Sequence, residues 1–327
     1  MKLPSYIGVL LGALYGLCYR LLCENGRFDS VSDIYRALDG YNIYSITFIW
    51  ILPIIIGLIP ILFAKDSLLN SKWKQFLLPL SSVLLFFLLA LSSGLEDWLC
   101  IIIIAFPFLI SAGLVGLILG TIILRIKSKK IYSILLLPFI LNPLETYLPI
   151  ENQYYTVNSE IIINADRATV WGNLIEVPEI ESSEYNYGLY NYLGVPRPIK
   201  SELLIINSQT YRIGYFTEGL KLCETISQKD SLRFVNFKIH LDKSELRDTP
   251  TDKHLLNSDY FKFENISYTL LKLSEEKTKL SLNCEYTLNS KMNTYANFWA
   301  QNIIHDFESK LLEVLKHKIE KTKQNKS

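Results

Sequence analysis

The chain has few of the features that mark a metalloprotein, a cofactor enzyme or a nucleic-acid-binding protein. Its 33 basic and 32 acidic side chains leave a net charge of +1, which indicates no basic surface for nucleic acid. The five cysteines and four histidines show no metal-binding spacing. No glycine-rich phosphate loop and no serine, histidine and aspartate arrangement stands out. We therefore expect no metal and no cofactor, and no motif identifies a catalytic residue.

What the sequence has instead is an uneven distribution of apolar residues. Strongly apolar stretches fill most of residues 1–150, and residues 151–327 contain none. A helix of about 20 apolar residues can span a bilayer, because its backbone groups hydrogen-bond to one another. We therefore expect a transmembrane bundle of about five helices in residues 1–150, followed by a water-soluble domain in residues 151–327. The five stretches are Leu3 to Leu22, Tyr41 to Ala64, Gln75 to Leu95, Leu99 to Leu124 and Ile131 to Ile150.

The loops between these stretches predict an orientation in the membrane. Basic residues follow the second stretch (Lys65, Lys72, Lys74) and the fourth (Arg125, Lys127, Lys129, Lys130), whereas the loop 24–40 and the turn at Glu96 and Asp97 are acidic. Loops rich in lysine and arginine stay cytoplasmic. Five crossings would then place the N-terminus inside and the soluble domain outside. Pro143 and Pro149 interrupt the fifth stretch, and a re-entrant segment there would return the domain to the cytoplasm.

Small and charged residues in the apolar half indicate packing rather than transport. Glycines recur in the first stretch (Gly8, Gly12, Gly16) and the fourth (Gly113, Gly116, Gly120). Such residues let helices approach closely, so packing within the bundle is expected, with homodimerisation through these faces as the alternative. The ionisable residues (Arg20, Glu96, Asp97, Glu145) lie near the ends of stretches, where side chains can reach the interface. A channel or ion-coupled transporter is therefore disfavoured.

The periodicity changes beyond Tyr154 and predicts an α+β domain. Residues 154–163 alternate as in a strand, and Asp166 is placed to cap a short helix that ends near Pro178. Six further strand signals follow between residues 202 and 288, and residues 241–257 are expected to form a long polar loop. A long helix from about Asn293 to Lys321 closes the chain. Its predicted apolar stripe is Ala296, Ala300, Ile303, Phe307, Leu311 and Val314. We expect a curved antiparallel sheet around this helix, with a cavity between them.

These elements resemble the START-like helix-grip superfamily, which includes polyketide cyclases, aromatase/cyclases and carriers of lipids or other hydrophobic ligands. The resemblance rests on Ala165, Asp166, Val170 and Trp171 after the first strand, and on Tyr295, Trp299, Ile303 and Leu311 in the last helix. The whole chain is similar to uncharacterised bacterial membrane proteins that join several transmembrane helices to such a domain. Matching residues are Gly194, Pro196, Pro198, Arg212, Phe216, Gly219, Glu224, Pro53 with Gly57, and Glu96 with Cys100. The resemblance implies a fold and a hydrophobic ligand, but no agreed activity. Because the similar proteins are bacterial, the expected location is the bacterial inner membrane, and the loop charges predict that the domain is on the periplasmic side.

One predicted hairpin brings charged residues together. If residues 217–219 form a three-residue loop with Gly219 at positive φ, Arg212 faces Glu224 on an otherwise apolar face. The pair could bind the polar end of a ligand or polarise a carbonyl. A structural ion pair at a sheet edge is the alternative, and a one-residue slip in register would separate the two residues. The candidate ligand-binding residues are Arg212, Phe216, Leu222, Glu224, Tyr286, Trp299 and Ile303.

Two classes of function remain. The first is a membrane-anchored module that binds a lipid or other hydrophobic small molecule, as a carrier, sensor or scaffold. The second is an enzyme of the cyclase or dehydratase type that acts on an apolar substrate from the membrane. An enzyme needs an acid or base in the cavity, and only Arg212, Glu218, Glu224 and Tyr286 are candidates. His305 is expected to face solvent or a neighbouring loop. Binding is therefore favoured, with the bilayer and a small molecule as partners and no nucleic acid.

Overall fold

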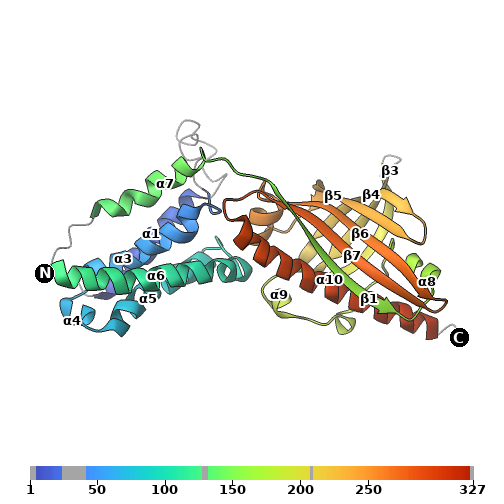
Figure 1. Cartoon of the computed structure of the whole chain (residues 1–327), viewed down its shortest axis with the longest axis horizontal. Helices are drawn as coiled ribbons and strands as arrows, with labels where there is room; N and C mark the ends of the chain where they lie inside the picture. The colour runs from blue at the N-terminus through green and yellow to red at the C-terminus, as the bar shows by residue number, and fades with distance from the viewer. Residues whose placement is uncertain (1–4, 24–41, 127–131, 207–208, 325–327) are drawn as a thin grey trace. The chain divides into compact units, whose positions relative to one another are not determined.

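The computed structural model describes residues 5–23, 42–126, 132–206 and 209–324, which fold into two compact units (Figure 1). The first unit comprises residues 1–151 and 290–292, and the second comprises residues 152–289 and 293–327. Several residues used above to predict orientation, namely the loop 24–40 and Lys127, Lys129 and Lys130, lie outside the described residues. The first residues of the first, second and fifth predicted stretches also lie outside them.

The first unit is helical. A π-helical turn (Thr47–Ile51) precedes the second of its helices, and a 3₁₀ turn (Tyr132–Leu136) precedes the last. Aromatic rings from four segments, including Tyr19, Phe48, Phe86 and Phe108, lie in the buried centre of the unit. Its helices are α1 (Ser5–Leu22), α3 (Leu52–Phe63), the short α4 (Asp66–Leu69), α5 (Lys72–Ser92), α6 (Trp98–Ile126) and α7 (Leu137–Glu145).

The prediction of about five transmembrane helices is corrected by the helix lengths. Among the described residues, two helices are long and apolar enough to span a membrane, Lys72–Ser92 and Trp98–Arg125. The other apolar helices, Tyr6–Leu22, Thr47–Phe63 and Ser133–Glu145, are shorter. The last of these contains Pro143 and ends at Glu145.

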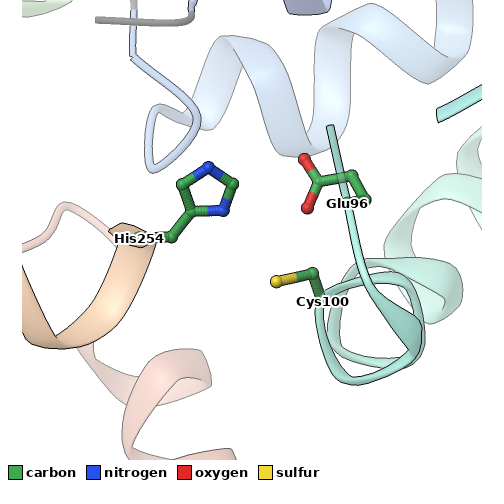
Figure 2. A group of neighbouring side chains, drawn as sticks. All are labelled: Glu96, Cys100 and His254. Atoms are coloured by element: carbon green, nitrogen blue, oxygen red, sulfur yellow. The ribbon is translucent and has the colours of Figure 1, made fainter. Parts of the chain in front are cut away.

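Arg20 and Glu96 pair with each other and Glu145 hydrogen-bonds within this unit, whereas the sequence predicts that these side chains reach an interface. The Arg20 side chain is fully buried, and its Nε lies 2.6 Å from Oε1 of Glu96. Arg20 also donates to the carbonyl of Leu95 at 2.9 Å. Oε1 of Glu145 accepts from the backbone N–H of Thr47 at 2.9 Å. Figure 2 shows Glu96 just before α6, Cys100 in the first turn of α6, and His254 in the second unit.

The glycines of the apolar half lie against neighbouring helices of the same unit. A Cβ atom on Gly8 would come within 2.9 Å of the Pro60 backbone in α3, and one on Gly57 within 3.0 Å of the Ala112 backbone in α6. Gly12 and Gly116 are equally confined, by α3 and α5. Small residues therefore let these helices pack closely, which is the role the sequence favours. A homodimer through the glycine faces stays a prediction.

The second unit is a seven-stranded antiparallel sheet with a long helix across it (Figure 1). The strand order is β1-β7-β6-β5-β4-β3-β2, so that β1 and β2 are the edges. Register shifts interrupt three of the strand pairs and bend the sheet. The strands are β1 (Gln153–Ile163), β2 (Pro198–Ile206), β3 (Gln209–Phe216), β4 (Lys221–Asp230), β5 (Phe234–Glu245), β6 (Phe261–Ser274) and β7 (Lys277–Leu288).

The long helix α10 (Asn293–Gln324) packs mainly on β1 and β7. Leu312, Leu315 and Ile319 from α10 share the main core with Leu280 and Leu282 of β7. Of the predicted stripe, Val314 is buried in this core and Leu311 is half-buried against it, whereas Leu312, which the stripe leaves out, is fully covered. The antiparallel sheet with its long closing helix is the helix-grip arrangement that the sequence predicts.

Two short helices complete the second unit. Asp166 caps α8 (Arg167–Gly172), as predicted, since its Oδ1 accepts from the N–H groups of Ala168 and Thr169 at 2.9 and 3.0 Å. The second is α9 (Leu189–Tyr192). The region predicted as one long polar loop, residues 241–257, instead begins as the end of β5 and contains a π-helical turn (Asp252–Leu256).

Candidate functional site

The turn between β3 and β4 sets the register of the candidate site. Phe216 N–H donates to the carbonyl of Leu220 at 2.9 Å across a three-residue loop. Gly219 has φ +83°, as predicted, and Glu218 is also left-handed at +61°. Arg212 therefore stands opposite Glu224, and Gly214 opposite Leu222. The predicted register is confirmed.

Arg212 and Glu224 form a buried ion pair. Their exposed fractions are 8% and 6%, and Arg212 Nη1 contacts Glu224 Oε2. Arg212 Nε also donates to the carbonyl of Ile175 at 2.8 Å, and its guanidinium lies 4.7 Å from the ring centroid of Phe237. Burial alone would lower the pKa of Arg212, but the adjacent Glu224 carboxylate raises it above its usual value. Because β3 and β4 are interior strands, the pair is not at a sheet edge.

Apolar candidates lie beside the pair. Leu222 is buried in a small cluster with Leu220 and Ile239. Phe216 is only half-buried, and its ring centroid lies 6.1 Å from that of Phe307 on α10. These contacts bring Arg212, Phe216, Leu222 and Glu224 together on the face of the sheet that α10 covers.

The other three candidates belong to a neighbouring region. Tyr286 is fully buried, stacks on Phe261 with a centroid distance of 5.5 Å and donates its hydroxyl to Asn297 Oδ1 at 2.7 Å. Burial raises the pKa of the Tyr286 hydroxyl. Trp299 and Ile303 are half-buried on α10. Phe263 and Ile266 pack against both the Tyr286 cluster and the Leu222 cluster, so that the two regions meet at β6.

One buried polar residue of the second unit, Glu308, is not among the candidates that the sequence predicts. Glu308 on α10 is 2% exposed, and its Oε2 accepts from the hydroxyl of Ser159 on β1 at 2.8 Å. Ser159 Oγ also lies 2.9 Å from Nδ1 of His305, whose side chain is otherwise exposed as expected. Tyr268 on β6 is buried, which raises its pKa to about 12. The available signal was the spacing of Ile304, Glu308 and Leu312, which puts a carboxyl on a buried helix face.

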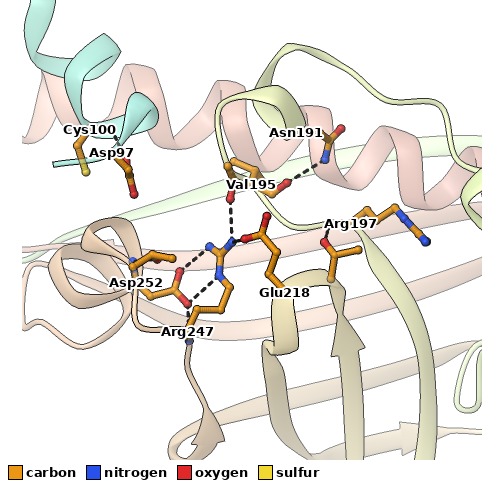
Figure 3. A network of polar contacts seen from close by, with 11 residues as sticks. Asp97, Cys100, Asn191, Val195, Arg197, Glu218, Arg247 and Asp252 are labelled. Carbon is orange, nitrogen blue, oxygen red and sulfur yellow. Dashed lines mark hydrogen bonds and ion pairs between the residues drawn. The ribbon is translucent and has the colours of Figure 1, made fainter. Parts of the chain in front are cut away.

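Glu218, one of the acid–base candidates, is part of a separate network (Figure 3). Arg247 Nη1 lies 2.6 Å from Glu218 Oε2 and donates to the carbonyl of Gly194 at 2.9 Å. Its Nη2 lies 2.7 Å from Asp252 Oδ1. Arg247 and Asp252 are buried, whereas Glu218 is exposed. This network joins three loops of the second unit and leaves Glu218 away from the sheet interior.

The sheet and closing helix define a helix-grip domain, and solved structures of similar type exist. The Zhui aromatase/cyclase from Streptomyces sp. R1128 is 13% identical over 51% of this chain and 94% of that protein, with a TM-score of 0.33. Truncated norcoclaurine synthase from Thalictrum flavum is 10% identical over 52% of this chain and 95% of that protein, with a TM-score of 0.32. An uncharacterised protein from Bacillus thuringiensis is 11% identical over 50% and 98%, also with a TM-score of 0.32.

No protein-family model and no curated protein matches the chain. The fold assignment rests on the strand order and on α10 themselves. No activity or ligand is carried over from the similar structures.

Proposed function

We propose that the second unit binds an apolar small molecule between the inner face of its sheet and α10. The proposal is supported by apolar side chains that point between these two layers and are only half-buried. Phe216, Phe263 and Ile266 on the sheet and Phe307 on the helix all keep accessible surface. Protein interiors are normally close-packed, so incompletely packed apolar surface between two layers favours a ligand.

The Arg212–Glu224 pair lies next to this apolar surface and would contact the polar end of the ligand. Gly214, between them and Phe216, carries no side chain; a Cβ there would meet the Phe216 ring at 3.2 Å and Glu224 Oε1 at 3.8 Å. A guanidinium paired to a carboxylate still has free N–H groups that can donate to a ligand oxygen. Leu222, Tyr286, Trp299 and Ile303 are the further contacts we propose for the apolar part.

Binding is preferred over catalysis because the predicted acid–base candidates are already engaged. Glu224 pairs with Arg212, Glu218 pairs with Arg247, and Tyr286 donates to Asn297. A general acid or base has to be within reach of substrate, and each of these groups would first have to leave its partner. The two long apolar helices of the first unit favour a location at a membrane, where the module would act as a carrier, sensor or scaffold.

The test is to purify the full chain and to identify co-purified apolar compounds by mass spectrometry. Ala300→Phe adds a ring at a half-buried position of α10 that packs beside Tyr286, and it should displace the compound. Gln301→Phe adds the same ring at the next, exposed position and should leave the compound bound. Thermal unfolding shows whether both variants fold. The proposal fails if the wild-type chain carries no enriched compound, or if a folded Ala300→Phe retains it.

A further inference from the structure

Glu308 is a carboxyl group in an apolar position. It lies on α10 one turn from Ile304 and one turn from Leu312, and it is 2% exposed. Leu312 belongs to the main core, and Ile304 packs against the Tyr286 cluster. Nothing in helix formation requires a carboxyl here, because leucine or alanine would extend the same buried face with a higher helix propensity.

The hydrogen bonds of Glu308 are incomplete. Its Oε2 accepts from Ser159 Oγ at 2.8 Å, whereas its Oε1 is shielded from water and has no hydrogen-bond partner. Among the described residues, no lysine, arginine or histidine forms an ion pair with Glu308. The nearby Lys310 instead contacts Asp306. An unpaired buried carboxylate is strongly disfavoured, so the geometry selects the neutral acid, in which one oxygen carries a proton.

The electrostatic surroundings agree with a neutral acid. Burial raises the pKa of Glu308 to about 8, although the hydrogen bond from Ser159 pulls in the opposite direction. The titratable groups that face it are Tyr268 on β6, Cys284 on β7 and, through Ser159, His305 on α10. The charges of the Arg212–Glu224 pair also act on Tyr268. None of these neighbours supplies a cation at Oε1.

We propose that Oε1 of Glu308 donates a hydrogen bond to an acceptor oxygen of the apolar ligand, such as a ketone or ester carbonyl. The inference rests on the proposed binding function and names the chemistry that the site recognises. Nδ1–H of His305 donates to Ser159, and Ser159 donates to Oε2 of Glu308. The carboxyl proton in this series of hydrogen bonds then lies on Oε1. Successive donors of this kind polarise one another and strengthen the last bond.

A carbonyl ligand fits this donor better than a charged one. A cationic ligand would gain no ion pair, because Glu308 is neutral. A ligand carboxylate would be buried beside Glu308 without a cation to pair with it. A carbonyl carries no charge and satisfies the single unpaired donor. Because Oε1 is covered, ligand entry includes a displacement of the side chains around it.

The test uses photolabelling of the full chain in detergent, with labelled peptides mapped by mass spectrometry. Benzophenone is an apolar probe with one carbonyl, and an aliphatic diazirine without oxygen is the matched probe. Glu308→Leu should reduce benzophenone labelling of inner-face peptides roughly tenfold, the value of one good hydrogen bond. Glu308→Gln keeps an N–H donor and should retain labelling. Glu313→Leu, at an exposed site on the same helix, should change nothing.

The oxygen-free probe separates the two proposals. If the diazirine does not label the inner face of the wild-type unit, the proposed binding function itself fails. If it labels all variants and Glu308→Leu also leaves benzophenone labelling unchanged, only the role of Glu308 is overturned.

An infrared measurement on the wild-type protein covers the case in which Glu308→Leu does not fold. The C=O band of carbon-13 benzophenone should shift as for a hydrogen-bonded carbonyl at about pH 6 and lose that shift above the Glu308 pKa of about 8. A band that is independent of pH also overturns the proposal.

Discussion

Arg212 on β3 and Glu224 on β4 form an ion pair inside the sheet, at directly opposed positions and with 8% and 6% of each residue exposed. The pair has further support on the arginine side, where the carbonyl of Ile175 and the ring of Phe237 surround the guanidinium. A buried pair of this kind is expensive to break, because removal of one partner leaves the other charge uncompensated in a poorly solvated place.

We therefore expect Arg212→Ala to lower the free energy of unfolding by about 3 kcal/mol or more, and Glu224→Ala to have a comparable effect. The double variant should cost much less than the sum of the two. Urea or thermal unfolding of the full chain, arranged as a double-mutant cycle, measures this coupling.

The matched control is Lys221 with Glu245, a cross-strand pair whose side chains are 38% and 68% exposed. Its coupling energy should stay below about 1 kcal/mol. Equal and small coupling energies for both pairs would mean that water reaches Arg212 and Glu224, and they would remove the reason to place a ligand's polar end there.

The hairpin shows why this part of the site could be predicted from sequence. A three-residue loop with glycine fixes the register, and the register alone determines that Arg212 meets Glu224. The burial of the pair could not be predicted from the hairpin, because Ile175 and Phe237, which surround the guanidinium, come from outside it. The buried position of Glu308 could not be predicted for a similar reason, because its partner Ser159 is 149 positions away along the chain. The rotation of α10 that buries Glu308 is set by packing against β1 and β7.

The buried carboxyl of Glu308 predicts a stability that falls with rising pH. Its pKa is raised from 4.5 to about 8, so between these values the folded chain holds a proton that the unfolded chain has released. Its contribution is complete below about pH 4.5 and is lost as pH rises through about 8. At about 1.4 kcal/mol per pKa unit, the loss is at most about 4 to 5 kcal/mol.

Unfolding of the wild-type chain and of Glu308→Gln across this pH range checks the assignment. The variant cannot ionise at position 308, so the difference between the two curves isolates Glu308 from His305 and other groups. Parallel curves would show that Glu308 ionises normally, with water or a cation beside it.

Tyr286 is predicted to act in packing and not as a proton donor to a ligand. Tyr286→Phe removes the 2.7 Å bond to Asn297, and it should lower the free energy of unfolding by about 1 kcal/mol. Asn297→Ala should give a similar loss, because it removes the same bond. Benzophenone labelling should be unchanged in Tyr286→Phe. Reduced labelling without loss of stability would instead place the hydroxyl on the ligand.

The helix-grip unit is predicted to fold without the apolar helices. It has its own core, formed by strands and helices that all follow Asn152. A fragment that starts at Asn152 should be soluble and show the circular dichroism of a mixed α and β protein. A fragment that stays unfolded, while the full chain folds, would show that the second unit depends on residues before Asn152.

The first unit was harder to predict in detail because hydropathy does not report helix ends. The apolar run Tyr41 to Ala64 reads as one span, yet its helical part begins near Thr47 with a π-helical turn. Likewise, the sequence predicts that Arg20 reaches the membrane interface, because it lies near the end of the first apolar stretch. Its partner Glu96 follows a different helix, so a local pattern could not show the pair.

The orientation of the second unit is the last prediction. Basic residues after the second and fourth apolar stretches favour an external, periplasmic location if the apolar half crosses the membrane an odd number of times. Asp248 suits a labelling test, because its side chain is 92% exposed and its only described ion pair is with the exposed Lys253. Asp248→Cys should therefore react in intact spheroplasts with a maleimide that cannot cross the membrane. Cys223 and Cys284 are buried, and Asp248→Ser measures the background from all native cysteines. Reaction only after lysis would place the unit in the cytoplasm and favour an even number of crossings.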